Sequence, residues 1–162
     1  MDSKNEIIET NQSLYMLIEE SIELIQYARQ ITAKQVNLVQ LMTYYSLGKW
    51  IVEEQQEGEE RAKYGKQVLK TLSESLTKEF GRGFSETNLE YARKFYLTYA
   101  DRISQTLFEE FAVKKSQTVI EELNEKQPFI VSWSHYLQLM RIENVDERKF
   151  YEIESAKSGW GI

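Results

Sequence analysis

The chain has 162 residues with 41% hydrophobic and 12% aromatic side chains, enough to bury the core of an ordinary domain. Its net charge of −6 argues against unspecific binding to nucleic acid, and the absence of cysteine excludes disulfides and thiolate metal sites. One proline and seven glycines favour long helices over a fold of strands and turns, so we predict an all-α, multi-helix fold.

No segment is typical of a secretory signal or a membrane span. The first ten residues are polar and acidic. The richest apolar window, residues 36–52, is interrupted by polar side chains and is too short to cross a bilayer. We therefore expect a cytoplasmic protein without membrane contact.

Two apolar patterns of helical period occupy the first third of the chain. Residues 7–31 carry apolar side chains at three-four spacing, opposite several glutamates: Leu14, Leu17, Ile18, Leu24, Ile25, Ala28 and Ile31. Residues 33–57 are apolar on most sides, which predicts a central helix or a continuation of the first helix into one long rod. The acidic run 53–60, which includes Gly58, predicts a solvated connection. The large apolar area of residues 14–51 predicts a homodimer with these helices paired across a two-fold axis.

A glycine-punctuated break between two helical patterns follows, and it predicts a helix-turn-helix. Residues 64–80 form the first pattern, and Gly81 lies where a left-handed residue would end that helix. Ser85 is a good N-cap for the second helix, and Phe84 can pack on Leu89 as a hydrophobic staple. The second pattern continues to about residue 100.

Positive charge is concentrated around this predicted helix-turn-helix. Residues 61–102 contain nine Lys and Arg against five Asp and Glu. Residues 1–60 contain four against eleven, and residues 103–162 contain seven against ten. Three segments of a mixed-charge protein also differ by chance, so charge alone does not decide for nucleic acid.

A helix-turn-helix that binds DNA lays its second helix in the major groove. We predict DNA contacts from polar and cationic residues on the turn and the second helix: Arg82, Asn88, Tyr91, Arg93 and Lys94. Asn88 has the donor and acceptor that read adenine, and the cations suit phosphates, with Lys66, Lys70 and Lys78 nearby. Glu86 and Glu90 oppose such contacts unless Arg93 or Lys94 neutralises them. Helix pairs joined by a glycine turn are also common in proteins that bind nothing.

The last third of the chain predicts shorter elements. Residues 101–125 allow one or two short helices. Residues 126–132 have strand character, with a proline that ends the preceding helix. Residues 134–142 return to helix, and Asp146 is expected to cap another that ends near residue 158.

No arrangement of residues in the sequence indicates catalysis. His135 is the only histidine, and we expect it to hydrogen-bond at a helix start. Glu147-Arg148-Lys149 resembles a nuclease string, but it falls in a predicted helix without a partner Asp on a strand. The sequence contains no glycine-rich phosphate loop. We therefore predict no catalytic residue, no metal site and no cofactor for this chain.

Two blocks of motifs span roughly residues 35–160. The first consists of Tyr45-x-x-Gly48-x-x-Ile51, Tyr64-Gly65, Leu72-Ser73, FGRGFS from Phe80, Asn88-Leu89 and Phe95-Tyr96. The second consists of Ser132-Trp133-Ser134-His135-Tyr136, Arg148-x-Phe150-Tyr151 and Trp160. In this order they resemble the N-terminal domain of the YhcG-type PDDEXK nuclease family.

The resemblance implies a helical domain that precedes a C-terminal PDDEXK nuclease domain in bacterial enzymes linked to DNA cleavage, mobile elements or defence. In that family the N-terminal part is regarded as a DNA-binding or assembly module. This chain stops at Gly161-Ile162, before the metal-binding carboxylates of such a nuclease would begin. We therefore expect that it does not cut DNA by itself and that the full-length protein is an endonuclease.

Taken together, the sequence predicts an N-terminal helical and dimerisation region, residues 1–58, and a helix-turn-helix-like region, residues 59–162, within one compact domain. The predicted function is a DNA-binding and targeting module for duplex or branched DNA. The alternative is a dimerisation or protein-interaction module that positions nuclease domains without contacting DNA. Ser134, His135 and Arg141 either extend the DNA contact or close the core.

Overall fold

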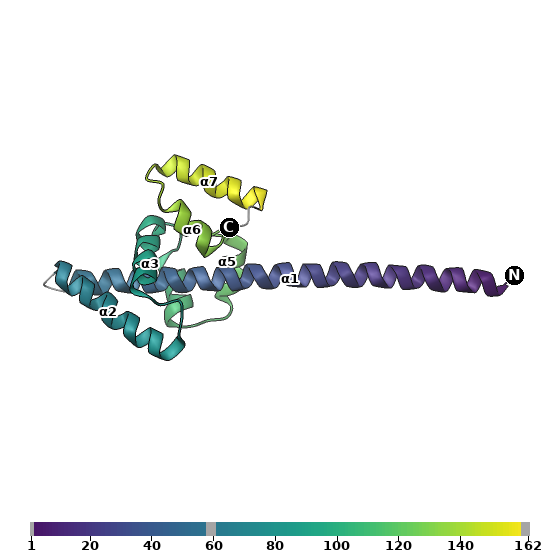
Figure 1. The fold of residues 1–162 in the computed structure, drawn as a ribbon, viewed down its shortest axis with the longest axis horizontal. Helices are drawn as coiled ribbons and strands as arrows, with labels where there is room; N and C mark the ends of the chain where they lie inside the picture. The colour runs from purple at the N-terminus through teal and green to yellow at the C-terminus, as the bar shows by residue number, and fades with distance from the viewer. Residues whose placement is uncertain (1, 58–60, 160–162) are drawn as a thin grey trace. The chain divides into compact units, whose positions relative to one another are not determined.

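The computed structural model describes residues 2–57 and 61–159 (Figure 1). All regular structure in these residues is helical, which confirms the predicted all-α fold. The elements in chain order are α1 Asp2–Glu57, α2 Arg61–Phe80, α3 Glu86–Tyr99, α4 Gln105–Phe108, the π-helix η1 Glu109–Val113, α5 Val119–Lys126, α6 Trp133–Leu139 and α7 Val145–Ser158. The solvated connection expected at residues 53–60 is corrected for residues 53–57, which remain helical as the end of α1, whereas residues 58–60 and the motif residue Trp160 lie outside the described residues.

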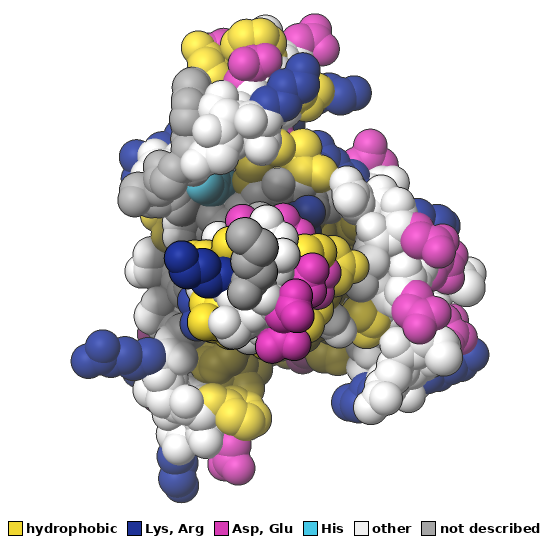
Figure 2. All heavy atoms as spheres, turned by 90° about the vertical axis from the view of Figure 1, so that its right-hand side faces the viewer, with side chains coloured by type: hydrophobic (Ala, Val, Ile, Leu, Met, Phe, Trp, Pro, Cys, Tyr) yellow, Lys and Arg dark blue, Asp and Glu magenta, His cyan; other side chains and the backbone are white. Residues whose placement is uncertain are grey.

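The chain forms two compact units, Met1–Val36 and Asn37–Ile162. Helix α1 runs through the division without a break, so the two N-terminal patterns form one continuous helix, as the second of the two sequence alternatives predicted. In the first unit, hydroxyl side chains bond to their own helix, as Ser21 does to the carbonyl of Leu17 at 2.6 Å. Figure 2, in which the N-terminal end of α1 faces the viewer, shows hydrophobic side chains at the surface of this helix beside acidic ones.

The core of the second unit is an aromatic cluster built from α1, α3, α6 and the segment before α6. Phe95 and Tyr136 are fully buried, and their ring centroids lie 5.3 Å apart. Phe95 also meets Trp133 edge-on at 5.2 Å and Phe129 at 4.9 Å. Tilted and edge-to-face aromatic pairs of this kind add to the free energy gained by burial.

Helix α3 crosses the C-terminal part of α1 at very short range (Figure 1). A Cβ placed on Gly48 of α1 would lie 2.1 Å from the carbonyl oxygen of Ala92 on α3. Only a residue without a side chain lets the two backbones approach so closely. Gly48 therefore fixes the distance between α1 and α3.

The strand predicted for residues 126–132 is wrong, because this segment has no partner strand in the described residues. Its backbone hydrogen bonds are made by side chains instead. The amide of Ile130 donates to the hydroxyl of Tyr136 at 2.9 Å, and the carbonyl of Val131 accepts from Asn37 at 3.0 Å. Side chains thus bond to the backbone of this partly buried segment in place of a partner strand.

The predicted cap of the last helix is also corrected. The side chain of Asn144, not Asp146, caps α7 by accepting from the backbone amide of Glu147 at 2.9 Å. Asp146 lies inside the first turn, where its negative charge interacts favourably with the partial positive charge at the N-terminal end of the helix. The helix ends at Ser158, as the sequence predicted.

We expect the protein to lose stability above about pH 10. Burial raises the pKa of Tyr45 and that of Tyr99 to about 12, and it also raises the pKa of Tyr136. The folded state holds these phenol protons more tightly than the unfolded chain does. The free energy of unfolding is therefore constant below the phenol pKa of the unfolded chain and falls above that pKa, by about 1 kcal/mol per buried phenol. Urea unfolding between about pH 8 and pH 11.5, beside a tyrosinate absorbance titration, measures this loss. A free energy of unfolding that stays level across that interval would contradict it.

Candidate nucleic-acid interface

The break between α2 and α3 has the geometry that its glycines and serine predict. Gly81 has a φ of 81°, and its amide closes α2 by donating to the carbonyl of Thr77 at 2.8 Å. The hydroxyl of Ser85 accepts from the backbone amide of Asn88 at 3.1 Å and so caps α3. Phe84 is half-buried, and its ring centroid lies 6.0 Å from that of Phe80. The helix-turn-helix-like element is therefore fixed at both helix ends.

The side chain of Asn88 is held inside the protein. Its amide nitrogen donates to the hydroxyl of Tyr44 at 3.0 Å and to the carbonyl of Gly83. Its amide oxygen accepts from the indole of Trp133 at 3.2 Å. Because these bonds use both amide protons and one acceptor position, the geometry weighs against the adenine contact predicted for this residue.

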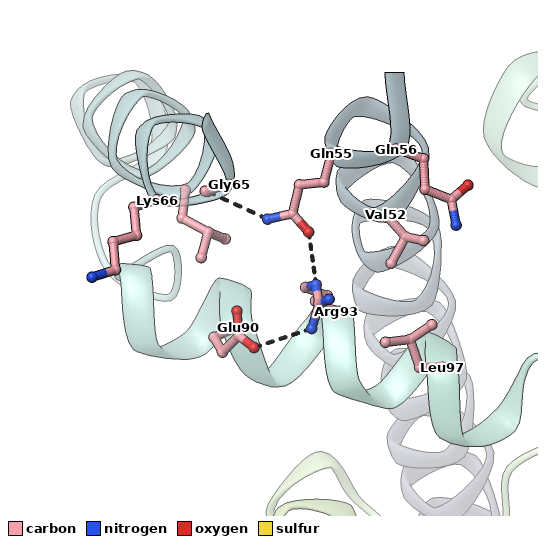
Figure 3. Close-up of a pocket in the computed structure, with 9 residues that line it drawn as sticks. Val52, Gln55, Gln56, Gly65, Lys66, Glu90, Arg93 and Leu97 are labelled. Atoms are coloured by element: carbon pink, nitrogen blue, oxygen red, sulfur yellow. Dashed lines mark hydrogen bonds and ion pairs between the residues drawn. The ribbon is translucent and has the colours of Figure 1, made fainter. Parts of the chain in front are cut away.

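Arg93 is also engaged within the fold, as Figure 3 shows. Its Nε donates to Gln55 of α1 at 2.7 Å, and a terminal nitrogen lies 3.3 Å from the carboxylate of Glu90. The amide of Gln55 in turn donates to the carbonyl of Gly65 at 3.3 Å. This chain joins α1, α2 and α3 beside a cavity of about 550 Å³, which Lys66 also lines. The Glu90 charge is neutralised by Arg93, as the sequence argument required.

The remaining predicted contacts of this element differ in exposure. Arg82 on the turn and Lys94 on the outer side of α3 are exposed. Tyr91 is half-buried and packs against the core cluster. Arg82 and Lys94 therefore present charge to solvent, whereas Asn88, Tyr91 and Arg93 hold the element in place.

The strongest cationic feature lies mainly on α2. Six exposed cationic side chains occupy α2, the turn and α3: Lys63, Lys66, Lys70, Lys78, Arg82 and Lys94. None of the six has a carboxylate oxygen within 4.0 Å among the side chains that the structure describes. We name this set the basic face; Glu74, four residues from both Lys70 and Lys78, is also exposed on this side of α2. Lys63 was missed from the sequence, although its three- and seven-residue spacing to Lys66 and Lys70 places all three on one side of a helix.

The second predicted contact set lies on α6 and the turn after it. Ser134 and Arg141 are exposed. His135 is half-buried, and its Nδ1 lies 2.7 Å from the hydroxyl of Ser132, the N-cap of α6. The expected hydrogen bond of His135 at a helix start is thereby confirmed. Ser134 and Arg141 remain candidates for a surface contact.

Comparison with known proteins assigns the family. Residues 20–162 match the family described as the DUF1016 N-terminal domain. The chain belongs to this family. It is 37% identical over 152 residues to a protein of Escherichia coli (strain K12) named "Putative nuclease YhcG", across 87% of this chain and 40% of that protein. The chain thus spans less than half the length of the relative it matches. No solved structure matches it significantly.

In this DUF1016 N-terminal domain, Asn88 links the two blocks of sequence motifs. It belongs to the first block, and the indole that it binds, Trp133, belongs to the second, 45 positions away. Trp133 also stacks on Tyr44, with ring centroids 4.3 Å apart. Residues from the two motif blocks therefore pack together at one site in the fold.

We expect Asn88→Ala to lower the free energy of unfolding by about 2 kcal/mol. The change leaves the indole N–H of Trp133 and the hydroxyl of Tyr44 without their amide partner in a half-buried site. Urea unfolding followed by circular dichroism measures the loss. Thr87→Ala, on an exposed neighbouring position of α3, is the matched control and should change stability by less than about 0.5 kcal/mol. Equal stability of the two variants would contradict the bracing role of Asn88.

The described residues were compared with the requirements of a metal site and of a membrane-spanning helix. No group of three or more His, Asp or Glu side chains in residues 2–57 and 61–159 is arranged to hold a metal ion. Within the same ranges, no helix combines the length and the apolar character that a bilayer span requires.

Proposed function

We propose that this domain binds duplex DNA and is a non-catalytic targeting module of a nuclease. The observation that carries the proposal is the basic face, six exposed cations without described carboxylate partners, on a helix-turn-helix-like element. The name of the relative in Escherichia coli supports the link to a nuclease. That relative is much longer than the match, so catalysis is assigned to parts of the full-length protein outside this domain.

The basic face suits a phosphate backbone better than base edges. Lysines on α2 and Arg82 on the turn offer long, solvated cations that release counterions when they meet phosphates. The outer side of α3 is poor in free hydrogen-bonding groups because Asn88 and Arg93 are engaged internally. The proposed contact is therefore electrostatic, with Lys94 as its cation on α3, and weakly selective for sequence.

Replacement of three cations of the basic face tests this proposal. The variant Lys70→Ala/Arg82→Ala/Lys94→Ala should weaken binding to a labelled duplex by roughly 10-fold or more at about 50 mM salt. It should also reduce the slope of log affinity against log salt by roughly one for each lost phosphate contact. Fluorescence anisotropy measures both quantities. Branched and single-stranded DNA titrated in parallel rank the preferred form.

The matched control removes the same charge elsewhere. Lys126→Ala/Lys149→Ala/Lys157→Ala replaces three exposed lysines of α5 and α7 and should bind the duplex as the unaltered chain does. Equal affinity of the two triple variants, or no measurable binding by the unaltered chain at low salt, would refute the proposed contact.

A second candidate function is assembly. Residues 7–31 expose a stripe of large apolar side chains, with Leu24 66% and Leu17 59% accessible. Exposed apolar area of this extent is typical of interaction surfaces. We propose that this stripe brings protein copies together, with or without DNA. A dimeric mass in light scattering would support the proposed assembly, and a monomeric mass at tens of micromolar would contradict it.

A further inference from the structure

Some of the exposed apolar side chains of the first unit form two rows with a seven-residue repeat, whereas Ile8, Tyr15 and Ile22 lie outside these rows. Leu17, Leu24 and Ile31 are each seven residues apart, and they are 59%, 66% and 45% exposed. Leu14, Ser21 and Ala28 form a second row at the same period, three residues before the first. The row at 17, 24 and 31 has the spacing of the d positions of a coiled coil, and the row at 14, 21 and 28 has that of the a positions. The stripe is thus built to receive another helix.

The two rows differ in size along the helix. The row at 17, 24 and 31 is uniformly large, whereas Leu14 is followed by the small residues Ser21 and Ala28. In a parallel pair, equal positions face each other, so Ser21 would meet Ser21 and Ala28 would meet Ala28. Each such layer leaves a gap in the seam, which costs stability. In an antiparallel pair, a positions face d positions, and large side chains fill the space beside small ones.

Charge along the same helix favours the same orientation. Residues 2–23 contain six Asp and Glu against one Lys. Residues 24–36 contain Arg29 and Lys34 and no acid. A parallel pair places the two acidic halves side by side, whereas an antiparallel pair places each acidic half against a basic half. Figure 2 shows the acidic side chains at the N-terminal end of α1 exposed to solvent.

We propose that residues 14–31 of α1 pair with the same residues of a second copy as an antiparallel coiled coil. Leu14 lies opposite Ile31 of the partner copy, Ser21 opposite Leu24, and Ala28 opposite Leu17. In this register Ile18 also lies beside Ile25 of the partner copy, on the flank of the seam. The inference deepens the assembly function proposed above and rests on it.

The paired segment carries a continuous apolar surface. Residues 14–31 form a helix about 27 Å long. Its exposed large apolar side chains include Leu14, Ile18 and Ile25, each at least 45% accessible, in addition to the d row.

The mass of the unaltered chain in solution decides whether a second copy binds. Light scattering at tens of micromolar should give twice the chain mass of 19.2 kDa. Leu17→Glu/Leu24→Glu should give the mass of a single chain, because it places charge in the seam. Gln26→Glu/Gln30→Glu, which adds the same charge on the polar side of the helix, should remain dimeric. A monomeric unaltered chain, or equal masses for the two variants, would overturn the proposal.

Engineered cysteines then decide the orientation, since the chain has none of its own. Opposite residues of the seam lie within disulfide reach, whereas Leu14 and Leu14 of the partner copy would lie about 26 Å apart in the antiparallel pair. Under mild oxidation, Leu14→Cys alone and Ile31→Cys alone should remain uncrosslinked, and their exchanged mixture should form a covalent dimer. Crosslinking of Leu14→Cys with itself would overturn the antiparallel register while leaving assembly intact. A monomeric mass in the light-scattering measurement would overturn both the antiparallel register and the assembly itself.

Discussion

Glu152→Ala should lower the free energy of unfolding by about 2–3 kcal/mol and loosen α7 from the second unit. The carboxylate of Glu152 is 4% exposed and lies 2.8 Å from the guanidinium of Arg102. Removal of one member of a buried pair leaves the other with an uncompensated charge, which costs about 3–5 kcal/mol when the pair is fully buried. We expect a loss at or below the lower limit of that range because a quarter of the Arg102 side chain remains accessible to water.

Glu152 attaches α7 together with Arg148, whose guanidinium lies 5.9 Å from the ring centroid of Tyr99. Glu152 is the only fully buried side chain of that helix among the described residues, while Phe150 and Val145 are more than half exposed. Its partner Arg102 also donates to the carbonyl of Pro128 at 3.1 Å and stacks over Tyr99 at 4.4 Å. One carboxylate thus connects α7 to the end of α3 and to the segment before α6.

Two companion variants separate charge from packing. Glu152→Gln keeps the shape and one acceptor for Arg102, so it should lose less stability than the alanine variant. Arg102→Met/Glu152→Met replaces the whole pair with apolar side chains and should unfold within about 1 kcal/mol of the unaltered chain. Urea unfolding gives the three free energies, and hydrogen exchange reports the opening of α7. If Glu152→Ala is as stable as the unaltered chain, the ion pair does not hold this helix.

The turn between α2 and α3 was predictable because its signals are local. Gly81 has to adopt a left-handed backbone, and a serine at position 85 caps the amides that follow it. Both properties depend on residues within four positions of each other. The long helix α1 was predicted only in part, since both N-terminal patterns indicated helix but the sequence left open whether they join into one.

The role of Asn88 was not predictable, because its partners are distant in sequence. Tyr44 lies on α1 and Trp133 on α6, and no periodicity in the chain pairs them with position 88. A polar residue on the first turn of a helix after a glycine turn has the same local pattern whether it contacts DNA or braces the core. The fold distinguishes the two cases by occupying both amide protons of Asn88.

The segment before α6 was mistaken for the same reason. Its run of apolar residues, Phe129, Ile130 and Val131, has the character of a strand. What the sequence could not supply was the origin of its hydrogen bonds, which come from the side chains of Asn37, Arg102 and Tyr136. The apolar run was therefore compatible with a strand but did not determine the presence of a sheet.

Gly48→Ala should cost about 2–3 kcal/mol, although alanine is the better helix former by about 1 kcal/mol. The new methyl group would lie 2.1 Å from the carbonyl oxygen and 2.7 Å from the carbonyl carbon of Ala92. Both are backbone atoms of α3, so they cannot rotate away, and the two helices have to separate. Such a shift disturbs the aromatic contacts between α1 and α3, for example that of Tyr45 with Phe95.

Gly65→Ala is the matched control because Gly65 also lies within a helix. Its added Cβ would meet the side-chain amide of Gln55 at 3.2 Å, and that side chain is flexible enough to move. The control should therefore be neutral or slightly stabilising through helix propensity, whereas Gly48→Ala should unfold at lower urea concentration. If both variants gain stability, the helices can separate at little cost, and close contact at Gly48 does not hold α3 and its basic face against α1.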